Sequence, residues 1–468
     1  MTPPLVRIAV VGALCAALAG ATLGGSALPE REPRPAPPVD PDGRTVTVCP
    51  AAPTINLVST TTWGALTTRP ITEEGTAPVP AGRGLTLTDQ PQPVVMIAEG
   101  RQNHGAAAAA FAKEAEGPDR GLALTRCGTP ATSLWFTGLV SDPDGSAATR
   151  TEVLLINADA GAAEVDLVLF GPSGLQVAPG ARGVAIPARS VRSVALDTLF
   201  TRAEPVGLQV RTTRGRIAAV ARPKVSAGVQ AAGTDWQASS LAPATEQIVA
   251  GIPAGPGPRT LMLTNPGKRR TTATVEVLGP DGTFAPVDAS TVDVNAESTV
   301  SVALQRAMQG EPGALRIRAE QPLVAAVAAR SGDDPEADIA IQASSAPLSG
   351  TSIGGVAVAG GTRGTLLITN PGDREIGVTA RVVATDGAEL TSTELRVAPG
   401  STAPWVIDGI ERPAAVLVGA PEDGAAYAGL VLTSAADPEG GLATSSLSIP
   451  SQEQGGGIDP IFDPGAGR

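Results

Sequence analysis

An internal repeat of about one hundred residues constrains this chain more than any other feature. Residues 153–174 read VLLINADAGAAEVDLVLFGPSG, residues 261–282 read LMLTNPGKRRTTATVEVLGPDG and residues 366–387 read LLITNPGDREIGVTARVVATDG. Each segment contains an apolar strand that ends at an asparagine, a polar turn, and a second strand of alternating polarity that closes on a glycine. The asparagines are Asn157, Asn265 and Asn370. Recurrence about every 105 residues predicts a chain built from copies of one structural unit.

The second half of each unit also recurs. Residues 236–243 (WQASSLAP), 341–347 (IQASSAP) and 442–450 (LATSSLSIP) share a Ser-Ser pair, and an apolar strand such as residues 323–330 (LVAAVAAR) precedes each of them. These segments are typical of the central and closing strands of a sheet.

The same pattern indicates a fourth, divergent copy near the N-terminus. Residues 106–113 (AAAAAFAK) favour a helix by propensity, but they align with LVAAVAAR. Residues 94–99 and 122–127 then align with the neighbouring strands of the other copies. We therefore predict a strand at residues 106–113 and a fourth unit over residues 45–130.

Composition favours an all-β fold. Glycine (55) and proline (43) are frequent, aromatic residues make up only 2% of the chain, and turn signals recur between short strands of alternating polarity. We predict tandem immunoglobulin-like antiparallel β-sandwiches after one N-terminal hydrophobic helix. The core tryptophan and inter-sheet cysteine pair of antibody domains are missing. A β-propeller is the alternative fold, although the period is about twice the length of one blade.

The N-terminus predicts export. Residues 8–27 carry no charge and are long enough to span a bilayer as a helix. A cleavable signal peptide that ends at residues 25–27 (GSA) is the competing interpretation, and both place the rest of the chain outside the cytoplasm. Cys15 lies in this segment after Leu14, which does not favour lipidation.

The predicted organisation has seven parts. They are a signal peptide or transmembrane anchor (1–28), a Pro-rich linker (29–43), a divergent sandwich (44–130), three further sandwiches (131–247, 248–350 and 351–450) and a disordered tail (451–468).

Two cysteines remain outside the N-terminal segment, Cys49 and Cys127. A pair of cysteines in an exported chain predicts a disulfide, and two buried free thiols are the alternative.

Few residues offer chemistry. The net charge of −12 argues against a nucleic-acid partner. His104 is the single histidine and lies in a turn-like stretch, and the chain has neither a Cys-x-x-Cys nor a Gly-x-Ser-x-Gly motif. We expect no catalytic residue, no cofactor and no metal. The acidic stretches 142–146 and 333–338 are interpreted as turns, with calcium binding as the alternative.

Tryptophan is the one residue type that points to a ligand surface. Trp135 and Trp236 lie in predicted strands, so we expect them to pack in cores. Trp63 lies in a polar, Thr-rich stretch and is the candidate for stacking on a ligand.

Residues 122–138 (LALTRCGTPATSLWFTG), followed by a strand, an asparagine and a Gly-Pro-x-Gly turn, resemble an uncharacterised actinobacterial family. The resemblance extends over residues 45–450 and rests on Cys127, Pro130, Trp135, Phe136 and Gly138. It implies an exported or membrane-anchored protein with tandem β-sandwiches in the cell envelope, and it brings no catalytic residues.

We therefore expect a non-catalytic surface protein of the cell envelope, secreted or held at the outer face of the membrane, that acts as a scaffold or interaction module. Its partners would be envelope proteins or wall glycan. The alternatives are an array that binds wall carbohydrate and an accessory subunit of a membrane enzyme.

Overall fold

The structure is a computed structural model of the whole chain. It describes residues 45–59, 65–79, 83–99, 106–144, 147–228, 230–304, 308–348, 351–354, 361–434 and 444–449. All of these belong to one compact unit, Pro41–Gly456. The expected N-terminal helix, the linker and the tail lie outside the described residues. Among the described residues, no helix is long and apolar enough to cross a membrane.

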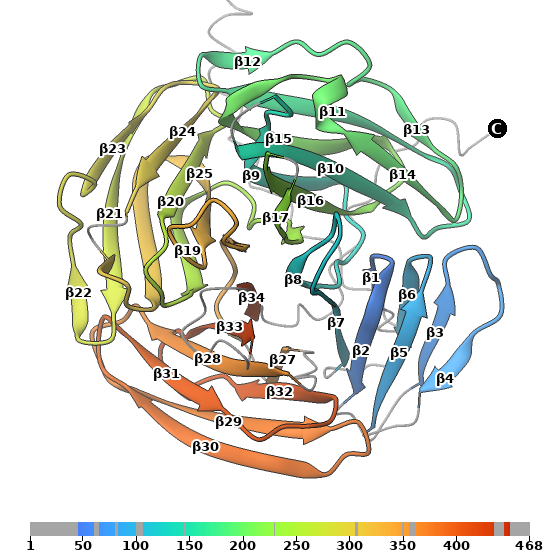
Figure 1. Ribbon diagram of the computed structural model, residues 1–468, viewed down its shortest axis with the longest axis vertical. Helices are drawn as coiled ribbons and strands as arrows, with labels where there is room; N and C mark the ends of the chain where they lie inside the picture. Colours follow the sequence, from blue (N-terminus) through green and yellow to red (C-terminus); the bar gives the residue numbers. More distant parts are fainter. Residues whose placement is uncertain are drawn as a thin grey trace, which may run out of the picture. The chain divides into compact units, whose positions relative to one another are not determined.

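The described chain is organised in β-strands joined by turns, which confirms the all-β prediction. The strands fall into four consecutive groups, which we call repeats 1 to 4 (Figure 1). Repeat 1 comprises β1 (Thr45–Cys49), β2 (Ala52–Ser59), β3 (Ala65–Pro70), β4 (Ala77–Val79), β5 (Gly84–Gln90), β6 (Val94–Glu99), β7 (Ala106–Glu114) and β8 (Gly121–Arg126). Repeat 2 comprises β9 (Ser133–Ser141), β10 (Ala147–Asn157), β11 (Ala163–Gly171), β12 (Gly174–Gln176), β13 (Val184–Ile186), β14 (Ser190–Ala195), the 3-10 turn η1 (Leu196–Thr198), β15 (Arg202–Arg214), β16 (Ala218–Ala227), β17 (Gln230–Thr234) and β18 (Gln237–Ala238).

The other two repeats have the same succession of strands. Repeat 3 comprises β19 (Ala244–Ile252), β20 (Arg259–Asn265), β21 (Thr271–Gly279), β22 (Gly282–Phe284), β23 (Thr291–Val294), β24 (Ser298–Ala303), β25 (Gly313–Arg330) and β26 (Ile339–Ala343). Repeat 4 comprises β27 (Thr351–Gly354), β28 (Thr362–Asn370), β29 (Ile376–Ala384), β30 (Glu389–Val397), β31 (Ser401–Ile407), β32 (Ala414–Gly419), β33 (Tyr427–Ser434) and β34 (Thr444–Ile449).

One topology describes all four repeats. We name the strand positions a, b, c, c′, d, e, f and g in chain order. In repeat 1 the sheets have the orders β1-β6-β3-β4 and β5-β2-β7-β8, which correspond to a-e-c-c′ and d-b-f-g. The main sheet orders of repeats 2 and 4 are the same. In repeat 3 the long strand β25 supplies both e and f: its first half pairs with β19 and β21, and its second half with β20 and β26.

This strand order differs from that of an immunoglobulin domain. Immunoglobulin strands divide into ABED and CFG, so that A and B are neighbours in one sheet. Here strands a to f alternate between the sheets, with a, c and e in one and b, d and f in the other, while c′ stays beside c and g beside f. The structure confirms paired antiparallel sheets, but it does not confirm the immunoglobulin-like part of the prediction.

The alanine-rich segment forms a strand, as predicted from its place in the repeat. In β7, Ala108, Ala110 and Ala112 pack in the core of repeat 1, whereas Ala109 and Phe111 pack against repeat 4. Both faces of β7 are therefore buried between sheets. Tertiary packing of this kind overrides the helix propensity of alanine.

The recurring asparagine holds the turn between strands b and c. Asn265 is fully buried. Its Nδ2 lies 2.8 Å from the carbonyl oxygen of Arg269 and 3.0 Å from that of Asn295, and its Oδ1 accepts a hydrogen bond from the Gly267 amide at 2.9 Å. The side chain thus satisfies backbone groups that would otherwise be buried without partners. Asn157 and Asn370 make the corresponding contacts.

Successive repeats contact each other through one kind of interface. Thr299 Oγ1, on strand d of repeat 3, donates to the carbonyl oxygen of Phe170 in repeat 2 at 2.8 Å. Thr402 Oγ1, on strand d of repeat 4, donates to the carbonyl oxygen of Leu278 in repeat 3 at 2.7 Å. In both cases the d-b-f-g sheet of one repeat packs against the a-e-c-c′ sheet of the preceding repeat.

The cycle of contacts closes between repeat 4 and repeat 1. The Gly84 amide donates to the carbonyl oxygen of Thr385 at 2.8 Å, and Phe111, Leu122 and Leu124 share a hydrophobic cluster with repeat 4. Repeats 1 and 2 meet through a separate apolar cluster that contains Val48, Val95, Ile97, Ile156 and Ala218. Every repeat therefore has two neighbouring repeats (Figure 1).

Replacing Asn265 with alanine should lower the free energy of unfolding by about 2–3 kcal/mol, because buried carbonyl groups lose their donor. Urea titration measures the change. The matched control is Lys268→Ala in the same turn, where the exposed side chain should matter by less than about 0.5 kcal/mol. Equal effects of the two substitutions would contradict the structural role of the asparagine.

Candidate functional site

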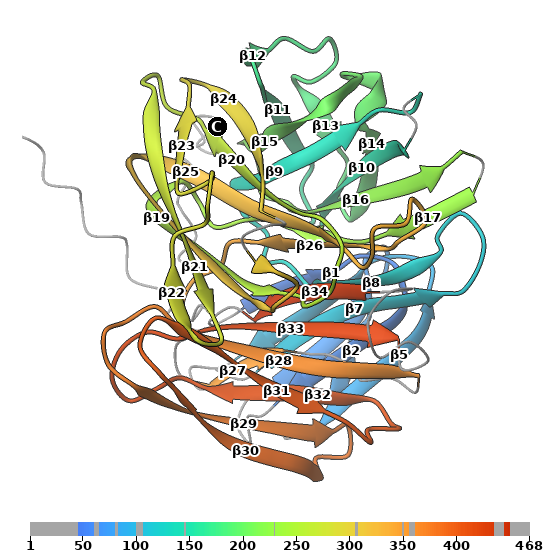
Figure 2. The same ribbon diagram turned by 60° about the vertical axis from the view of Figure 1, so that its left-hand side comes forward.

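The closing strands of the four repeats meet at one place in the unit. Strand β34 contacts both β8 and β26, and β8 also contacts β17 and β18. Figure 2 shows β8, β26 and β34 next to one another. Polar side chains gather here, and we therefore consider this junction first as a candidate site.

Asp235 is the central residue of the junction. It directly follows β17, two residues before β18, and is fully buried. Its carboxylate accepts hydrogen bonds from the amides of Leu124 (3.3 Å), Trp236 (2.8 Å) and Ile341 (2.7 Å) and from the Ser445 hydroxyl (2.8 Å). These donors come from repeats 1, 2, 3 and 4 respectively. One side chain therefore joins all four repeats.

Burial determines the electrostatics of Asp235. The loss of solvent raises the pKa of its carboxyl group well above the ordinary range, and the negative charge of Asp338 acts in the same direction. The hydrogen bonds from Ile341, Ser445 and Trp236 oppose this increase, because they stabilise the ionised form. A buried carboxylate with several donors is a structural anchor as long as those donors stay in place.

Asp338, in the turn before β26, is a second fully buried carboxylate. It accepts hydrogen bonds from the amides of Leu122 at 2.8 Å and Ile339 at 2.9 Å. A Cβ atom on Gly233 would lie 2.3 Å from Asp338 Oδ1, so only glycine allows this approach. Residues 333–338 form a turn, as interpreted, but contact with β8 buries Asp338 at its end.

Arg120 of repeat 1 also contacts this junction. Its Nη1 lies within hydrogen-bonding distance of three backbone carbonyl oxygens, those of Ala231 (3.2 Å), Ala232 (3.0 Å) and Glu336 (3.0 Å). These acceptors belong to repeats 2 and 3. A planar guanidinium with several donors suits such a bridging position.

The recurring Gln-Ala-Ser-Ser motif is also used for architecture. Gln237 Nε2 donates to the carbonyl oxygen of Thr137 at 2.8 Å, and Gln342 Nε2 donates to that of Gly251 at 2.9 Å. Each glutamine thereby holds strand g of its repeat close to strand a. Ser445, from the Ser-Ser pair of repeat 4, donates to Asp235.

The junction has the contacts of a structural site. Its two carboxylates accept hydrogen bonds from backbone amides and are shielded from solvent, so neither has the access to substrate that a general acid or base requires. Within the described ranges, no group of three or more His, Cys, Asp or Glu side chains is placed to hold a metal ion.

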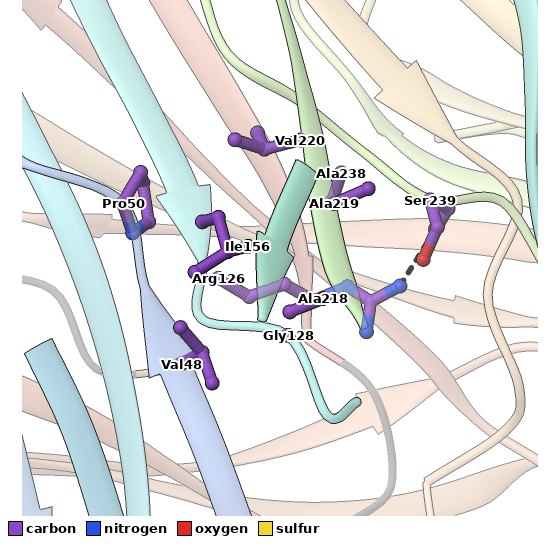
Figure 3. A pocket seen from close by; sticks show the side chains of 10 residues that line it. All are labelled: Val48, Pro50, Arg126, Gly128, Ile156, Ala218, Ala219, Val220, Ala238 and Ser239. Atoms are coloured by element: carbon purple, nitrogen blue, oxygen red, sulfur yellow. Dashed lines mark hydrogen bonds between the residues drawn. The ribbon is translucent and has the colours of Figure 1, made fainter. Parts of the chain in front are cut away.

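A crevice lies beside the junction, between repeats 1 and 2 (Figure 3). Val48, Ile156 and Val220 are among its lining residues, and Arg126 Nη2 donates to the carbonyl oxygen of Ser239 at 2.7 Å on its wall. Its free volume of about 10 Å³ suits about one water molecule, whereas small-molecule sites are typically several hundred Å³.

The predicted disulfide is confirmed. Cys49 and Cys127 are bonded, with their Cα atoms 4.3 Å apart and a sequence separation of 78. The bond joins the end of β1 to the residue after β8. Next to it, Val48 and Gly128 exchange backbone hydrogen bonds at 2.8 and 2.9 Å. The disulfide therefore holds strands a and g of repeat 1 together, at the end of β8, whose amides bind Asp235 and Asp338.

Trp135 and Trp236 pack in the interior, as predicted. Trp135 stacks on Phe170 with the ring centroids 5.9 Å apart, and the pair packs against Val324 of repeat 3. Trp236 is buried in a cluster with Cys49 and Cys127. Both are packing residues, as predicted. Trp63 and His104 lie outside the described residues.

Sequence reasoning missed Asp235, Asp338 and Arg120. A signal for Asp235 was present, because it is an acidic residue immediately before the recurring closing strand (WQASS). Asp338 has a similar place, shortly before IQASS, but its neighbouring acidic residues suggested an exposed loop. Nothing in the sequence around Arg120 indicates its acceptors, which are more than one hundred residues away.

Replacing both cysteines (Cys49→Ala with Cys127→Ala) should lower the free energy of unfolding by about 3–4 kcal/mol, because the unfolded chain is released from a long closed loop. Urea titration under oxidising conditions measures this loss. Full reduction of the native protein should reproduce it, and an unchanged midpoint in both experiments would contradict the expectation.

Asp235→Asn should remove a pH dependence of stability. Because the pKa of Asp235 is raised in the folded state, folding takes up a proton between the unfolded value of about 4 and the folded value. The native protein should therefore gain stability as the pH falls through this interval, and the asparagine variant should lack that gain. The measurement is the difference between their unfolding free energies at several pH values down to about 4. A difference that does not change with pH would contradict the assignment.

Comparisons with known proteins give a family without a described activity. No curated protein matches the chain. A bacterial structure described as "Structural insight into host cell surface retention of a 1.5-MDa bacterial ice-binding adhesin" is 12% identical and covers 69% of this chain and 98% of its own, with a TM-score of 0.11. A similarity at that level supports no argument about fold or function. Residues 85–406, which extend from repeat 1 into repeat 4, match the family of unknown function DUF5719. The chain therefore belongs to that family.

Proposed function

We propose that this protein is a non-catalytic interaction module or scaffold of the cell envelope. The observation that supports this most directly is the use of its recurring polar residues. The repeated asparagines, glutamines and the Ser445 hydroxyl all bind backbone or side-chain groups of the fold itself. The motifs that recur between the repeats therefore stabilise the fold. The exposed turns and strand edges are the parts of the surface that can contact other molecules.

Two further observations support an extracytoplasmic role. The Cys49–Cys127 disulfide suits an oxidising compartment. The uncharged segment of residues 8–27 has the composition of an export signal or a membrane anchor. We propose on these grounds that the folded unit acts at the outer face of the membrane or after secretion.

The partners are proposed to be envelope proteins. The described tryptophans support this choice over wall glycan, because sugar sites present aromatic side chains to solvent, whereas Trp135 and Trp236 are buried and Trp405 packs partly against the core of repeat 4. Glycan binding would therefore depend on Trp63, whose position the structure does not describe, or on the exposed part of Trp405.

A binding experiment separates these possibilities. The purified protein, immobilised through its C-terminus, is exposed to protein-free wall polysaccharide and to solubilised envelope protein. We expect retention of envelope protein that protease treatment abolishes, and no retention of polysaccharide. Binding of polysaccharide that Trp63→Ala abolishes would favour the glycan-binding alternative. Retention of neither would overturn the proposal.

A second experiment tests the alternative of an accessory subunit of a membrane enzyme. Residues 1–28 are replaced with a cleavable signal. That alternative requires the variant to lose binding to its membrane partner.

A further inference from the structure

Strand β30 leaves a long sheet edge open. It is the terminal strand of the sheet β27-β32-β29-β30 and spans nine residues, Glu389–Val397. Its pairing with β29 is regular from Thr391 to Val397 and shifts register between Glu389 and Thr391. In both views no strand lies beyond it (Figures 1 and 2). Alternate backbone amides and carbonyls along such an edge point away from the sheet and are free to pair with another strand.

The equivalent edges of the other repeats are short or interrupted. In repeat 1 the c′ strand is β4, which has three residues and contains Pro78. In repeat 2 the segment between β12 and β13 contains Pro179, and in repeat 3 the segment between β22 and β23 contains Pro286. Proline and short strands are the usual means of preventing edge-to-edge pairing. In repeat 4, β30 is nine residues long and contains no proline. Its one register shift lies at its start, between Glu389 and Thr391, so the edge formed by the rest of the strand stays open.

The sequence of β30 is complementary to itself in one antiparallel register. A twofold axis that is normal to the sheet and passes midway between the Leu395 residues of two adjacent copies would place Glu394 of each copy opposite Arg396 of the other. Leu395 would then lie opposite Leu395 and Thr393 opposite Val397. Opposite charges and β-branched or apolar pairs are the favourable cross-strand neighbours. Shifting the axis to Glu394 or to Arg396 would place like charges opposite each other.

The charged side chains are in position for this pairing. Glu394 and Arg396 are both exposed on the face away from the sandwich core, whereas Leu395 packs toward that core. Among the described residues, Glu394 has no ion-pair partner, and Arg396 approaches only Glu375, at 4.0 Å. Glu394 can therefore bind the opposite charge of a second chain, and Arg396 can do so by exchanging its long contact with Glu375.

We propose that two copies of this chain associate through their β30 strands, in antiparallel register about Leu395, to form one continuous sheet across the dimer. Such an interface is isologous, with the same residues on both sides. It is separate from the envelope partner proposed above and does not depend on that partner.

The charge pair provides a direct test. Sedimentation velocity of the purified full-length protein over a concentration series should show a monomer–dimer equilibrium. Glu394→Arg alone and Arg396→Glu alone should each raise the dimer dissociation constant by about tenfold, because two cross-strand pairs become repulsive. Glu389→Arg is the matched control: it changes an exposed charge on the same strand outside the paired register, and it should leave the constant unchanged.

Mixing the two single variants gives the decisive result. A chain with two arginines at these positions faces a chain with two glutamates, so the mixture should form a heterodimer as tight as the native dimer. The double variant E394R/R396E should also recover self-association. A native protein that stays monomeric at all concentrations, single variants that associate as tightly as the native protein, or a mixture that fails to associate would each overturn the proposal.

Discussion

The arrangement of the four repeats depends on the hydrogen bonds that converge on Asp235. Its carboxylate is fully buried and accepts donors from β8, from the amide of Trp236, from β26 and from Ser445 in β34. A charge in such a place is costly unless its donors are held in position. The closing segment of each repeat must therefore lie at the junction with its donor directed at Asp235. The position of one repeat in this way constrains the positions of the other three.

This constraint also explains what the recurring residues do. Asn265 and its counterparts hold the turn after strand b, Thr299 and Thr402 join neighbouring repeats, and the glutamines hold strand g against strand a. All of these contacts are made within the unit. This use of the recurring residues within the fold is the observation on which the proposed scaffold or interaction role is based.

Parts of the fold were predictable because local patterns carry them. The alternation of buried and exposed residues identifies strands such as β29. Alignment with the other repeats corrected the helix propensity of residues 106–113, and an even pair of cysteines in a chain expected to be exported predicted the disulfide. The strand order was not predictable in the same way. The patterns identify which segments are strands, but they do not specify that successive strands alternate between two sheets, so the immunoglobulin-like order is not what the structure has.

The sequence alone determined the repeat, the all-β class and the disulfide pair, because each of these depends on periodicity or on residue type along the chain. Only the tertiary structure decided that repeat 4 contacts repeat 1 and that Asp235 and Asp338 are buried. It also revealed that β30 alone keeps a long open edge at its position. These features depend on segments far apart in sequence, such as Leu122 and Asp338, which lie 216 residues apart and form one hydrogen bond. Burial and charge are properties of the assembled sheets, so an acidic residue in a polar stretch of sequence becomes a buried anchor only when four closing strands meet around it.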